Sequence, residues 1–340
     1  MKVLGIETSC DETSIAVVED GRHVLSNVIS SQIDIHTFFG GVVPEIASRK
    51  HVEVIKTIYK NALEKANVDI KDIDLIAVTK GPGLVGALLV GVSFAKGLSI
   101  SSKKPMLGVN HIEGHICANY ISNENLQPPY ICLVVSGGHT YLVEVKDYLN
   151  YIIHGSTIDD ACGECFDKVA RVMGLPYPGG PKLEQRAMLG IEKTYDMPYG
   201  EVKDRPYDFT FSGLKSHTIN LIHNLQQKNE ILTDAEINNI SRSFQDMIIE
   251  SLSRRTLMLA KKLNINKVAI CGGVSANESI KQNLKHKMEA NNIEFYYPEK
   301  VYCTDNAAMI ASCGYYVFRE NCTASNLSMD ALPYMEFNKR

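Results

Sequence analysis

The sequence predicts an α/β protein with two domains and partly parallel sheets. Its 340 residues are enough for two well-buried cores. Apolar strand-like segments alternate with helical segments along the chain, which is typical of α/β folds. Two hairpins, at residues 3–18 and 130–143, share one plan: an apolar strand, a polar turn of small and hydroxyl residues, and an apolar return. This similarity indicates a weak internal duplication, with two unrelated hairpins as the alternative.

The first half of the chain opens with three apolar segments separated by polar turns, a pattern typical of a β-meander. We expect a helix to begin at Pro44, because proline is common in the first helical turn. The run from Leu84 to Ala95 is shorter than the roughly 20 helical residues that span a bilayer, so we expect a buried helix there. The expected elements are strands at 3–8, 15–18, 23–29, 75–79 and 106–109, and helices at 44–67, 84–98 and from 111 onward.

The second half continues the alternation of strands and helices. Glycine and proline clusters mark its turns, and Gly272-Gly273 separates a buried strand from a helix. We expect the tail after Asn321 to be loosely held. The expected elements are strands at 131–135, 142–143, 267–271 and 295–297, helices at 159–174, 233–263 and 305–318, and a loop at 177–181.

Composition narrows the class of protein. Hydrophobic residues make up 45% and charged residues 22% of the chain, as in ordinary soluble globular proteins. A net charge of −4 argues against a stand-alone nucleic-acid binder, but it leaves room for a local basic patch or for RNA presented with partners. An acid at Glu7 interrupts the opening residues, so we expect no signal peptide and therefore reduced, mostly buried thiols, including the spaced pair Cys162 and Cys165.

The segment His111-Ile112-Glu113-Gly114-His115 predicts a metal site. Histidines four residues apart on a helix differ by about 40°, so both imidazoles leave one face, whereas Glu113 points away. This differs from the H-E-x-x-H pattern of zinc proteases. Asp305, where a strand gives way to a helix, is the candidate third ligand, and two histidines with a carboxylate suit Fe²⁺ or Zn²⁺. The alternatives are a helix cap at Asp305 and an ordinary core or surface histidine pair.

Two glycine turns are candidate phosphate sites. Ser136-Gly137-Gly138 allows backbone N–H groups to approach a phosphate, although a plain hairpin turn explains it equally well. Gly272-Gly273 is a stronger indication, because it precedes a helix N-terminus. The segment from Ser275 to Glu278 also fits a capping box, in which case Asn277 is an exposed first-turn residue.

Several acids are candidates for proton transfer or binding. Asp11 and Glu12 stand together in the first turn, where they could orient or deprotonate an amine, or simply be solvated. Asp160 and Asp167 lie on one helix face, and Asp167 could bond ribose hydroxyls or pair with a neighbouring cation at Lys168 or Arg171.

Nine segments taken together resemble the tRNA N6-adenosine threonylcarbamoyltransferase family (TsaD), once described as O-sialoglycoprotein endopeptidases. The resemblance covers residues 1 to about 320, and His139 resembles the bacterial and mitochondrial branch. The segments, in family order, are Gly5–Thr13, Gly40–Glu45, His111–His115, Ser136–Thr140, Asp160–Asp167, Pro178–Pro181, Phe211–Lys215, Gly272–Asn277 and Thr304–Asn306.

The resemblance implies an actin-like ATPase-domain (ASKHA) fold, with duplicated α/β lobes around a central cleft. Lobe I would comprise residues 1–110, with the helix at about 305–320 returning to it, lobe II residues 111–304, and a tail residues 321–340.

The resemblance also implies a reaction, in which threonylcarbamoyl-AMP donates its threonylcarbamoyl group to N6 of the adenosine 3′ of the anticodon, in tRNAs reading codons that start with A. His111, His115 and Asp305 match the family's ligands for one divalent metal, usually Fe²⁺, with Zn²⁺ as the alternative. Asp11 and Glu12 match acids that the family needs. Adenylate-binding positions match Val134, Val135, Ser136, Gly137, Gly138, Asp167, Gly180 and Asn277, and Glu184 falls where some members have an acidic ligand.

Partners and rival functions follow from the same resemblance. The family's bacterial members work in the cytoplasm with a degenerate paralogue (TsaB) and a small ATPase (TsaE), and we expect no membrane association. Candidate tRNA phosphate contacts, or ordinary surface cations, are Lys50, Lys182, Arg186 and Lys215. A metalloprotease is disfavoured because Glu113 points away from the metal, so no glutamate lies beside it as a base. A sugar or acyl kinase is disfavoured because Glu7-Thr8-Ser9 lacks the glycine usual in the first loop of such enzymes. A TsaB-like protein is disfavoured because such proteins lack the histidine pair.

Overall fold

The computed structural model describes residues 1–337, except for the side chains of residues 228 and 229. The chain divides into two compact units. Unit 1 comprises Met1–Pro128, Lys146–Tyr151 and Tyr297–Arg340, and unit 2 comprises Pro129–Val145 and Ile152–Tyr296. The first division therefore falls after Pro128, whereas the sequence reading placed it after residue 110. The reason is that the helix carrying the histidines packs against the long C-terminal helix of unit 1.

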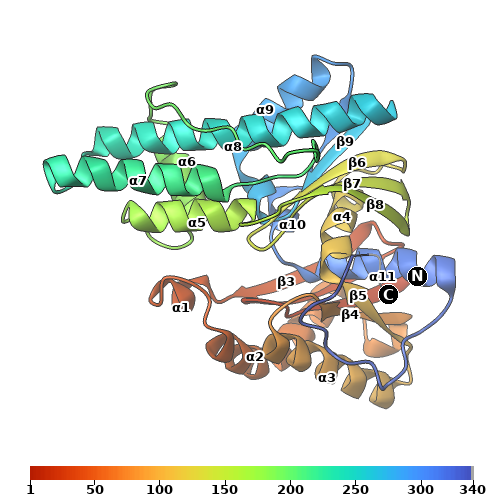
Figure 1. The fold of residues 1–340 in the computed structure, drawn as a ribbon. Coiled ribbons are helices and arrows are strands. Elements are labelled where there is room, and N and C mark those ends of the chain that lie inside the picture. The colour runs from red at the N-terminus through yellow and green to blue at the C-terminus, as the bar shows by residue number, and fades with distance from the viewer. Residues whose placement is uncertain (338–340) are drawn as a thin grey trace. The chain divides into compact units, whose positions relative to one another are not determined.

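Unit 1 contains a five-stranded mixed sheet in the order β3-β2-β1-β4-β5. The meander β1–β3 is antiparallel, and β4 and β5 continue the sheet parallel to β1 (Figure 1). The strands expected in this half are confirmed. Their bounds are β1 Lys2–Glu7, β2 Glu12–Glu19, β3 His23–Ser31, β4 Leu75–Gly81 and β5 Met106–Asn110.

Helices cover both faces of this sheet. Side chains of α2 and α3 join those of β1, β2 and β4 in one hydrophobic core, and α4 and α11 lie on the other face (Figure 1). The helix expected at 44–67 is confirmed as α2. The bounds are α1 Ile33–Thr37, α2 Pro44–Ala66, η1 Ile70–Asp72, α3 Val85–Ser102, α4 His111–Ser122, α10 Lys300–Cys303 and α11 Ala307–Asn321.

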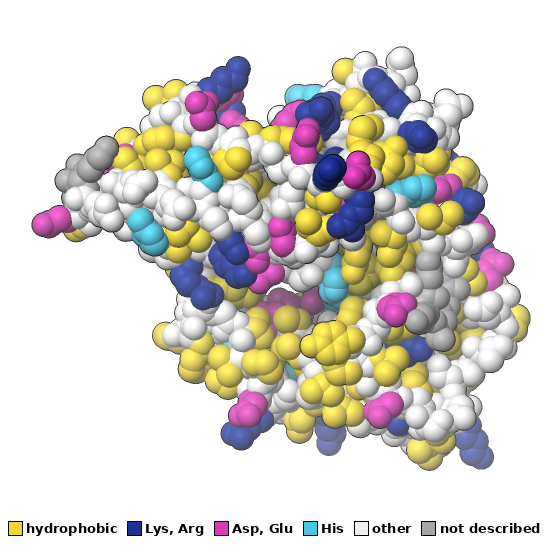
Figure 2. All heavy atoms as spheres, in the orientation of Figure 1, with side chains coloured by type: hydrophobic (Ala, Val, Ile, Leu, Met, Phe, Trp, Pro, Cys, Tyr) yellow, Lys and Arg dark blue, Asp and Glu magenta, His cyan; other side chains and the backbone are white. Residues whose placement is uncertain are grey.

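The expectation that α3 is a buried helix is wrong. By length and composition alone this helix could cross a membrane, but only 28% of its 18 residues are buried. Leu88 and Val92 on its inner side belong to the core, whereas Leu89 is 42% exposed. Hydrophobic side chains gather on the visible surface over α2 and α3 (Figure 2). The apolar run in the sequence therefore covers a core on one side and forms a surface on the other.

The described part of the tail, residues 322–337, is held against unit 1 rather than loose, and residues 338–340 lie outside the described residues. The N–H of Ser325 donates to the carbonyl of Met106 at 2.7 Å, and the N–H of Leu332 donates to Lys80 at 2.6 Å. Because β5 is the edge of the sheet, its outer backbone groups need partners, and the tail supplies them. The sequence prediction missed this role because the tail has no strand or helix pattern.

Unit 2 repeats the plan of unit 1. Its sheet has the order β10-β9-β6-β7-β8, in which β6 and β7 form an antiparallel hairpin and β9 and β10 run parallel to β6. This corresponds strand for strand to the order in unit 1, so the internal duplication predicted from the two hairpins is confirmed. The bounds are β6 Tyr130–Val135, β7 Thr140–Asp147, β8 Asn150–Ser156, β9 Lys267–Cys271 and β10 Glu294–Tyr296.

The helices of unit 2 include the expected ones, with small shifts at their ends. Helix α8 begins with a capping box formed by Thr233 and Glu236. Helix α6 starts at Gly179, within the segment expected to be a loop. The bounds are α5 Cys162–Val172, α6 Gly179–Ala187, α7 Ser212–Asn229, α8 Asp234–Leu263, η2 Gly273–Ala276 and α9 Glu278–Glu289.

Candidate functional site

The two histidines of unit 1 lie at the start of α4, which begins directly after β5. The side chain of Asn110 caps this helix by accepting two first-turn N–H groups, at 2.8 and 3.3 Å. Gly114 lets the helix approach α11, because a Cβ at this position would lie 2.7 Å from Ile310 Cδ1. His111 and His115 are one turn apart with ring centroids separated by 4.7 Å, so the predicted common face exists.

Asp305 completes a three-residue cluster with these histidines. It lies between α10 and α11, with Oδ1 3.4 Å from Nε2 of His111 and 3.2 Å from Nε2 of His115. One ligand atom from each residue lies within 4.8 Å of the others. The alternative reading of Asp305 as the cap of α11 is wrong, because Asn306 caps that helix. Two imidazole nitrogens and a carboxylate oxygen fit Fe²⁺ or Zn²⁺.

Glu7, which the sequence analysis did not single out, supports the cluster from behind. Its Oε2 lies 3.1 Å from Nδ1 of His111 and accepts the hydroxyl of Thr79 at 2.6 Å. The hydroxyl of Ser9 also lies 3.2 Å from Nδ1 of His111. A metal-binding histidine is commonly oriented by such a carboxylate, which fixes the tautomer and leaves Nε2 for the ion. His115 differs, because its buried Nδ1 has no hydrogen-bond partner among the described residues.

The pKa values of the cluster reflect two carboxylates around one imidazole. Burial lowers the pKa of His111, but Asp305 and Glu7 raise it more strongly, so it lies well above its usual value. Burial raises the pKa of Asp305, but His111 and His115 lower it well below the usual range. Burial likewise raises the pKa of Glu7, and His111 lowers it overall. The carboxylates therefore favour a positive charge here, carried by a proton or a metal ion.

The two acids of the first turn have different surroundings. Asp11 is buried, and its backbone carbonyl accepts the N–H of Gln32 at 3.0 Å. Burial, the charge of Asp305 and the neighbouring Asp11 raise the pKa of Glu12 to about 10. These causes favour the neutral form of Glu12, which can donate a hydrogen bond.

In unit 2, the predicted glycine turns lie at the ends of neighbouring parallel strands. Ser136-Gly137-Gly138 follows β6, and Gly272-Gly273 follows β9. Gly272 has φ +89°, and a Cβ there would lie 2.4 Å from the carbonyl oxygen of Val135. A Cβ on Gly137, Gly138 or Gly273 would meet nothing within 4 Å. We call these three residues the open glycines. Their exposed backbone can approach a phosphate, as such nests of N–H groups do.

Two helix starts in the same unit involve four of the predicted binding residues, which are Asp167, Gly180, Glu184 and Asn277. Oδ1 of Asp167 accepts the N–H groups of Gly179 and Gly180 at 2.8 and 3.2 Å, which starts α6. Burial raises the pKa of Asp167 although these N–H groups lower it. Oε1 of Glu184 accepts two N–H groups at the start of α9, at 2.7 and 3.2 Å.

The cap of α9 differs from the predicted one. Asn277, not Ser275, caps the helix, with Oδ1 accepting the N–H of Ile280 at 2.9 Å and Nδ2 donating to Gln245. Asn277 is buried rather than exposed, and the capping box from Ser275 to Glu278 is wrong, because residues 273–276 form a separate 3₁₀ turn.

The acids at the start of α5 have a structural role that the sequence analysis missed. Oδ1 of Asp159 accepts the N–H groups of Phe211 and Ser212 at 2.9 and 3.3 Å. Asp160 pairs with Lys168 at 2.7 Å and with Lys215. Although burial raises it, hydrogen bonds from these two lysines lower the pKa of Asp160 to about 2. Both motifs were visible in the sequence, but nothing in either one indicated their contact.

The candidate tRNA cations are mostly engaged. Lys215 contacts Asp160, Arg186 pairs with Asp234 at 2.8 Å, and Lys50 pairs with Glu53 at 3.0 Å, whereas Lys182 is exposed. These contacts favour the reading of the first three as structural or surface cations.

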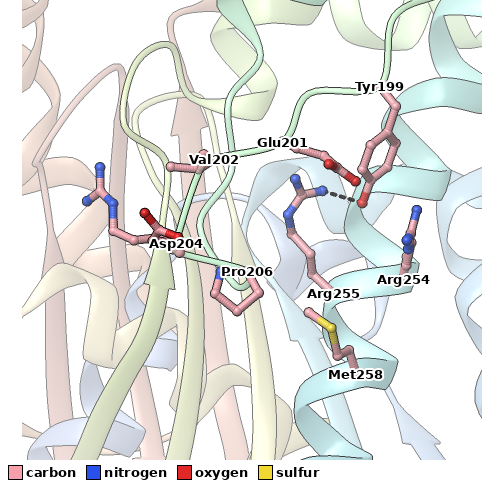
Figure 3. A pocket seen from close by; sticks show the side chains of 9 residues that line it. Tyr199, Glu201, Val202, Asp204, Pro206, Arg254, Arg255 and Met258 are labelled. Carbon is pink, nitrogen blue, oxygen red and sulfur yellow. Dashed lines mark hydrogen bonds between the residues drawn. The ribbon is translucent and has the colours of Figure 1, made fainter.

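A cavity of about 250 Å³ in unit 2 contains none of the predicted residues (Figure 3). Arg255 lies at its wall and donates to the hydroxyl of Tyr199 and to the carbonyl of Asp208, both at 2.8 Å. The buried guanidinium thus serves to join α8 to the preceding loop.

Comparison with known proteins identifies the family. The sequence model of the tRNA N6-adenosine threonylcarbamoyltransferase family (TsaD) matches residues 23–312. A protein of that name from Caldicellulosiruptor saccharolyticus is 52% identical over 335 residues, 98% of each chain. One from Clostridium perfringens is 50% identical over 338 residues, 99% of this chain and 98% of the relative.

A solved structure supports the expected class of fold. Full-length HypF, in its phosphate- and nucleotide-bound form, matches 94% of this chain and 55% of its own with a TM-score of 0.62 at 17% identity. This agrees with the actin-like ATPase-domain class, and the resemblance seen in the sequence is confirmed by relatives that are half identical over nearly the full length. The chain is a member of the tRNA N6-adenosine threonylcarbamoyltransferase family.

Proposed function

We propose that this chain catalyses tRNA threonylcarbamoylation with threonylcarbamoyl-AMP as donor and with one divalent metal held by His111, His115 and Asp305. The acceptor is N6 of the adenosine 3′ of the anticodon. The observation that carries the metal proposal is the convergence of three ligand atoms within 4.8 Å, next to a buried carboxylate at Glu7. Fe²⁺ is the first candidate, and Zn²⁺ fits the same donor set.

The donor is a mixed anhydride, so the protein needs mainly to position it and to stabilise charge. We propose that the open glycines bind the AMP phosphate through their N–H groups, with Asp167, Gly180, Glu184 and Asn277 around the nucleoside. A bound metal would polarise the carbonyl or neutralise the leaving phosphate. The reaction forms a C–N bond to adenosine N6 and breaks the C–O bond to AMP.

The proton lost from N6 is assigned to Asp11. An exocyclic amine is a poor nucleophile, and a carboxylate that accepts its proton accelerates attack by roughly 10²–10⁴-fold. We assign the role to Asp11 rather than to Glu12, because burial and the charges of Asp305 and Asp11 raise the pKa of Glu12 and so favour its neutral form. Glu12 would instead donate a hydrogen bond to Asp11 or to the substrate.

The matched pair Asp11→Asn and Glu12→Gln tests the function and this assignment together. In single-turnover transfer from labelled threonylcarbamoyl-AMP to tRNA, Asp11→Asn should slow the reaction at least about 100-fold. Glu12→Gln should retain most of the rate, because its amide replaces a carboxyl that is already neutral. Equal retention in both variants would contradict the base assignment. Absence of transfer by the unaltered chain with its partners, alongside phosphorylation of a small substrate or peptide cleavage, would favour the kinase or protease alternative.

We further propose that the exposed face of α2 and α3 binds a paralogous partner, with a small ATPase completing the assembly. A groove of about 520 Å³ in unit 1 is lined by apolar side chains, including Val52, which is 63% exposed, and Leu89. Leu89→Glu should abolish co-elution with the paralogue while metal content stays unchanged, and Lys65→Glu, an exposed charge reversal in the last turn of α2, is the control. A tRNA-modifying assembly of this kind would work in the cytoplasm.

A further inference from the structure

The loop between α1 and α2 presents two adjacent phenylalanines to solvent. Phe38 is 89% exposed and Phe39 is 58% exposed. Single exposed apolar side chains are common on protein surfaces, but two neighbouring aromatic rings form a patch that usually serves binding. We call residues 32–43 the aromatic loop.

Hydrogen bonds fix the backbone of this loop around a buried residue. His36 lies at its centre and is fully buried, with its carbonyl accepting the N–H groups of Phe39 and Gly41 at 3.0 and 3.2 Å. The Nδ1 of His36 accepts the N–H of Val43 at 3.3 Å. Positive φ at Gly40, +69°, reverses the chain there. The backbone is therefore fixed around a buried residue while the two rings stay outside.

Both ends of the loop are attached to the turn that carries the acids. At its start, Gln32 donates to the carbonyl of Asp11 at 3.0 Å. Just beyond its end, His51 of α2 lies 2.9 Å from the carbonyl of Cys10 and 2.7 Å from the hydroxyl of Thr13. All of these residues belong to unit 1, so the loop and the acid pair form one local structure.

We infer that the aromatic loop stacks an unpaired base of the anticodon loop and so positions the target adenosine beside Asp11. The inference rests on the proposed function, which places adenosine N6 next to that carboxylate. Sequence-specific proteins bind single-stranded RNA loops by stacking splayed bases on exposed aromatic side chains. A chain with a net charge of −4 cannot rely on phosphate attraction alone, so stacking would supply affinity that a basic surface would otherwise give.

Kinetics of the reconstituted reaction test the inference. Phe38→Ala and Phe39→Ala should each raise KM for tRNA about 5- to 100-fold, the range for loss of one base stack, without changing donor affinity. Replacement by tryptophan at the same positions should restore KM. Ile231→Ala, between α7 and α8 in unit 2, is the matched control and should leave KM unchanged, because Ile231 is 77% exposed but belongs to neither the aromatic loop nor the turn that carries the acids.

A binding measurement keeps the inference separate from catalysis. The chain has no tryptophan, so Phe39→Trp creates a single tryptophan, whose emission can be excited apart from that of the 16 tyrosines. Its emission should be quenched by an anticodon stem-loop RNA and not by the same stem with abasic loop positions, while Ile231→Trp should not respond. Unchanged KM in both alanine variants would overturn the inference, as would loss of partner assembly with normal tRNA binding, which would assign the rings to a protein contact. In either case transfer by the unaltered chain would still support the proposed function.

Discussion

The two units carry their candidate sites at corresponding places in duplicated sheets but build them from different groups. In unit 1, the end of β1 brings the buried side chain of Glu7 to His111. In unit 2, the corresponding strand β6 ends at Val135 and is followed by the turn with Gly137 and Gly138, where an added Cβ would meet nothing within 4 Å. A metal needs fixed side-chain donors with balanced charge, whereas a phosphate needs access to N–H groups. In the proposed scheme, one duplicated scaffold holds a metal site in unit 1 and a phosphate site in unit 2, and the residues at and after the strand ends account for the difference.

The largest effect is expected from a substitution that disrupts only the metal-ligand cluster of unit 1. Asp305→Asn should remove bound metal and lower single-turnover transfer by roughly a thousandfold, since a metal supplies several kcal/mol of charge stabilisation. Binding of a non-hydrolysable adenylate analogue to unit 2 should survive. Elemental analysis measures the metal content of the variant, and calorimetry measures its affinity for the analogue. Full metal occupancy in the variant would show that Asp305 is not a ligand.

A smaller effect in unit 1 tests the carboxylate behind the histidine. Glu7→Gln should weaken metal affinity about 10- to 100-fold, because a neutral amide no longer orients His111 or balances the charge of the ion. Thr79→Val removes the second hydrogen bond to Oε2 of Glu7 and is the control, with affinity expected to change much less. Chelator competition at neutral pH measures both. Equal losses in the two variants would point to a general packing defect instead.

Two glycine substitutions in unit 2 separate the structural role of Gly272 from the proposed phosphate-binding role of Gly137. Gly272→Ala should destabilise the fold by about 2 kcal/mol and lower Tm by several degrees, because φ is +89° and the added Cβ would overlap Val135. Gly137→Val should leave Tm nearly unchanged but weaken adenylate binding roughly tenfold, the cost of about one charge-assisted hydrogen bond. Thermal melts with and without the analogue distinguish the two roles. A normal affinity in Gly137→Val would place the phosphate elsewhere.

The sequence predicted the parts of this arrangement that have a local period or an obvious terminus. The i,i+4 spacing of His111 and His115 predicts their common face. The prediction of Asp305 rested on an expected strand end, which was wrong because Asp305 follows α10, but its place beside the histidines was predicted. Glu7 was not, because its partner lies 104 residues away and a lone acid in an apolar strand has no distinctive pattern. The same limit applies to the tail on β5, which forms hydrogen bonds through its backbone.

Local rules also failed where two of them competed. Ser275 and Glu278 have the spacing of a capping box, but a 3₁₀ turn at 273–276 shifts the helix start and gives the cap to Asn277. The apolar run from Leu84 to Ala95 predicts burial, yet a helix has two sides and only tertiary contacts decide which of them is covered.

The smallest expected effect concerns the ion pairs that Asp160 forms with Lys168 and Lys215 in unit 2. Asp160 has a pKa of about 2 in the folded protein against 3.8 for a free side chain, although burial opposes the lowering by Lys168 and Lys215. A depressed pKa stabilises the fold above pH 3.8, and this contribution is lost as pH falls toward 2. Asp160→Asn should therefore cost about 1 kcal/mol at pH 7, the scale of a partly exposed pair, and progressively less below pH 4. Denaturant melts of both proteins across this range would show the gap closing, and a gap that stays constant down to pH 2 would mean that Asp160 contributes through shape rather than charge.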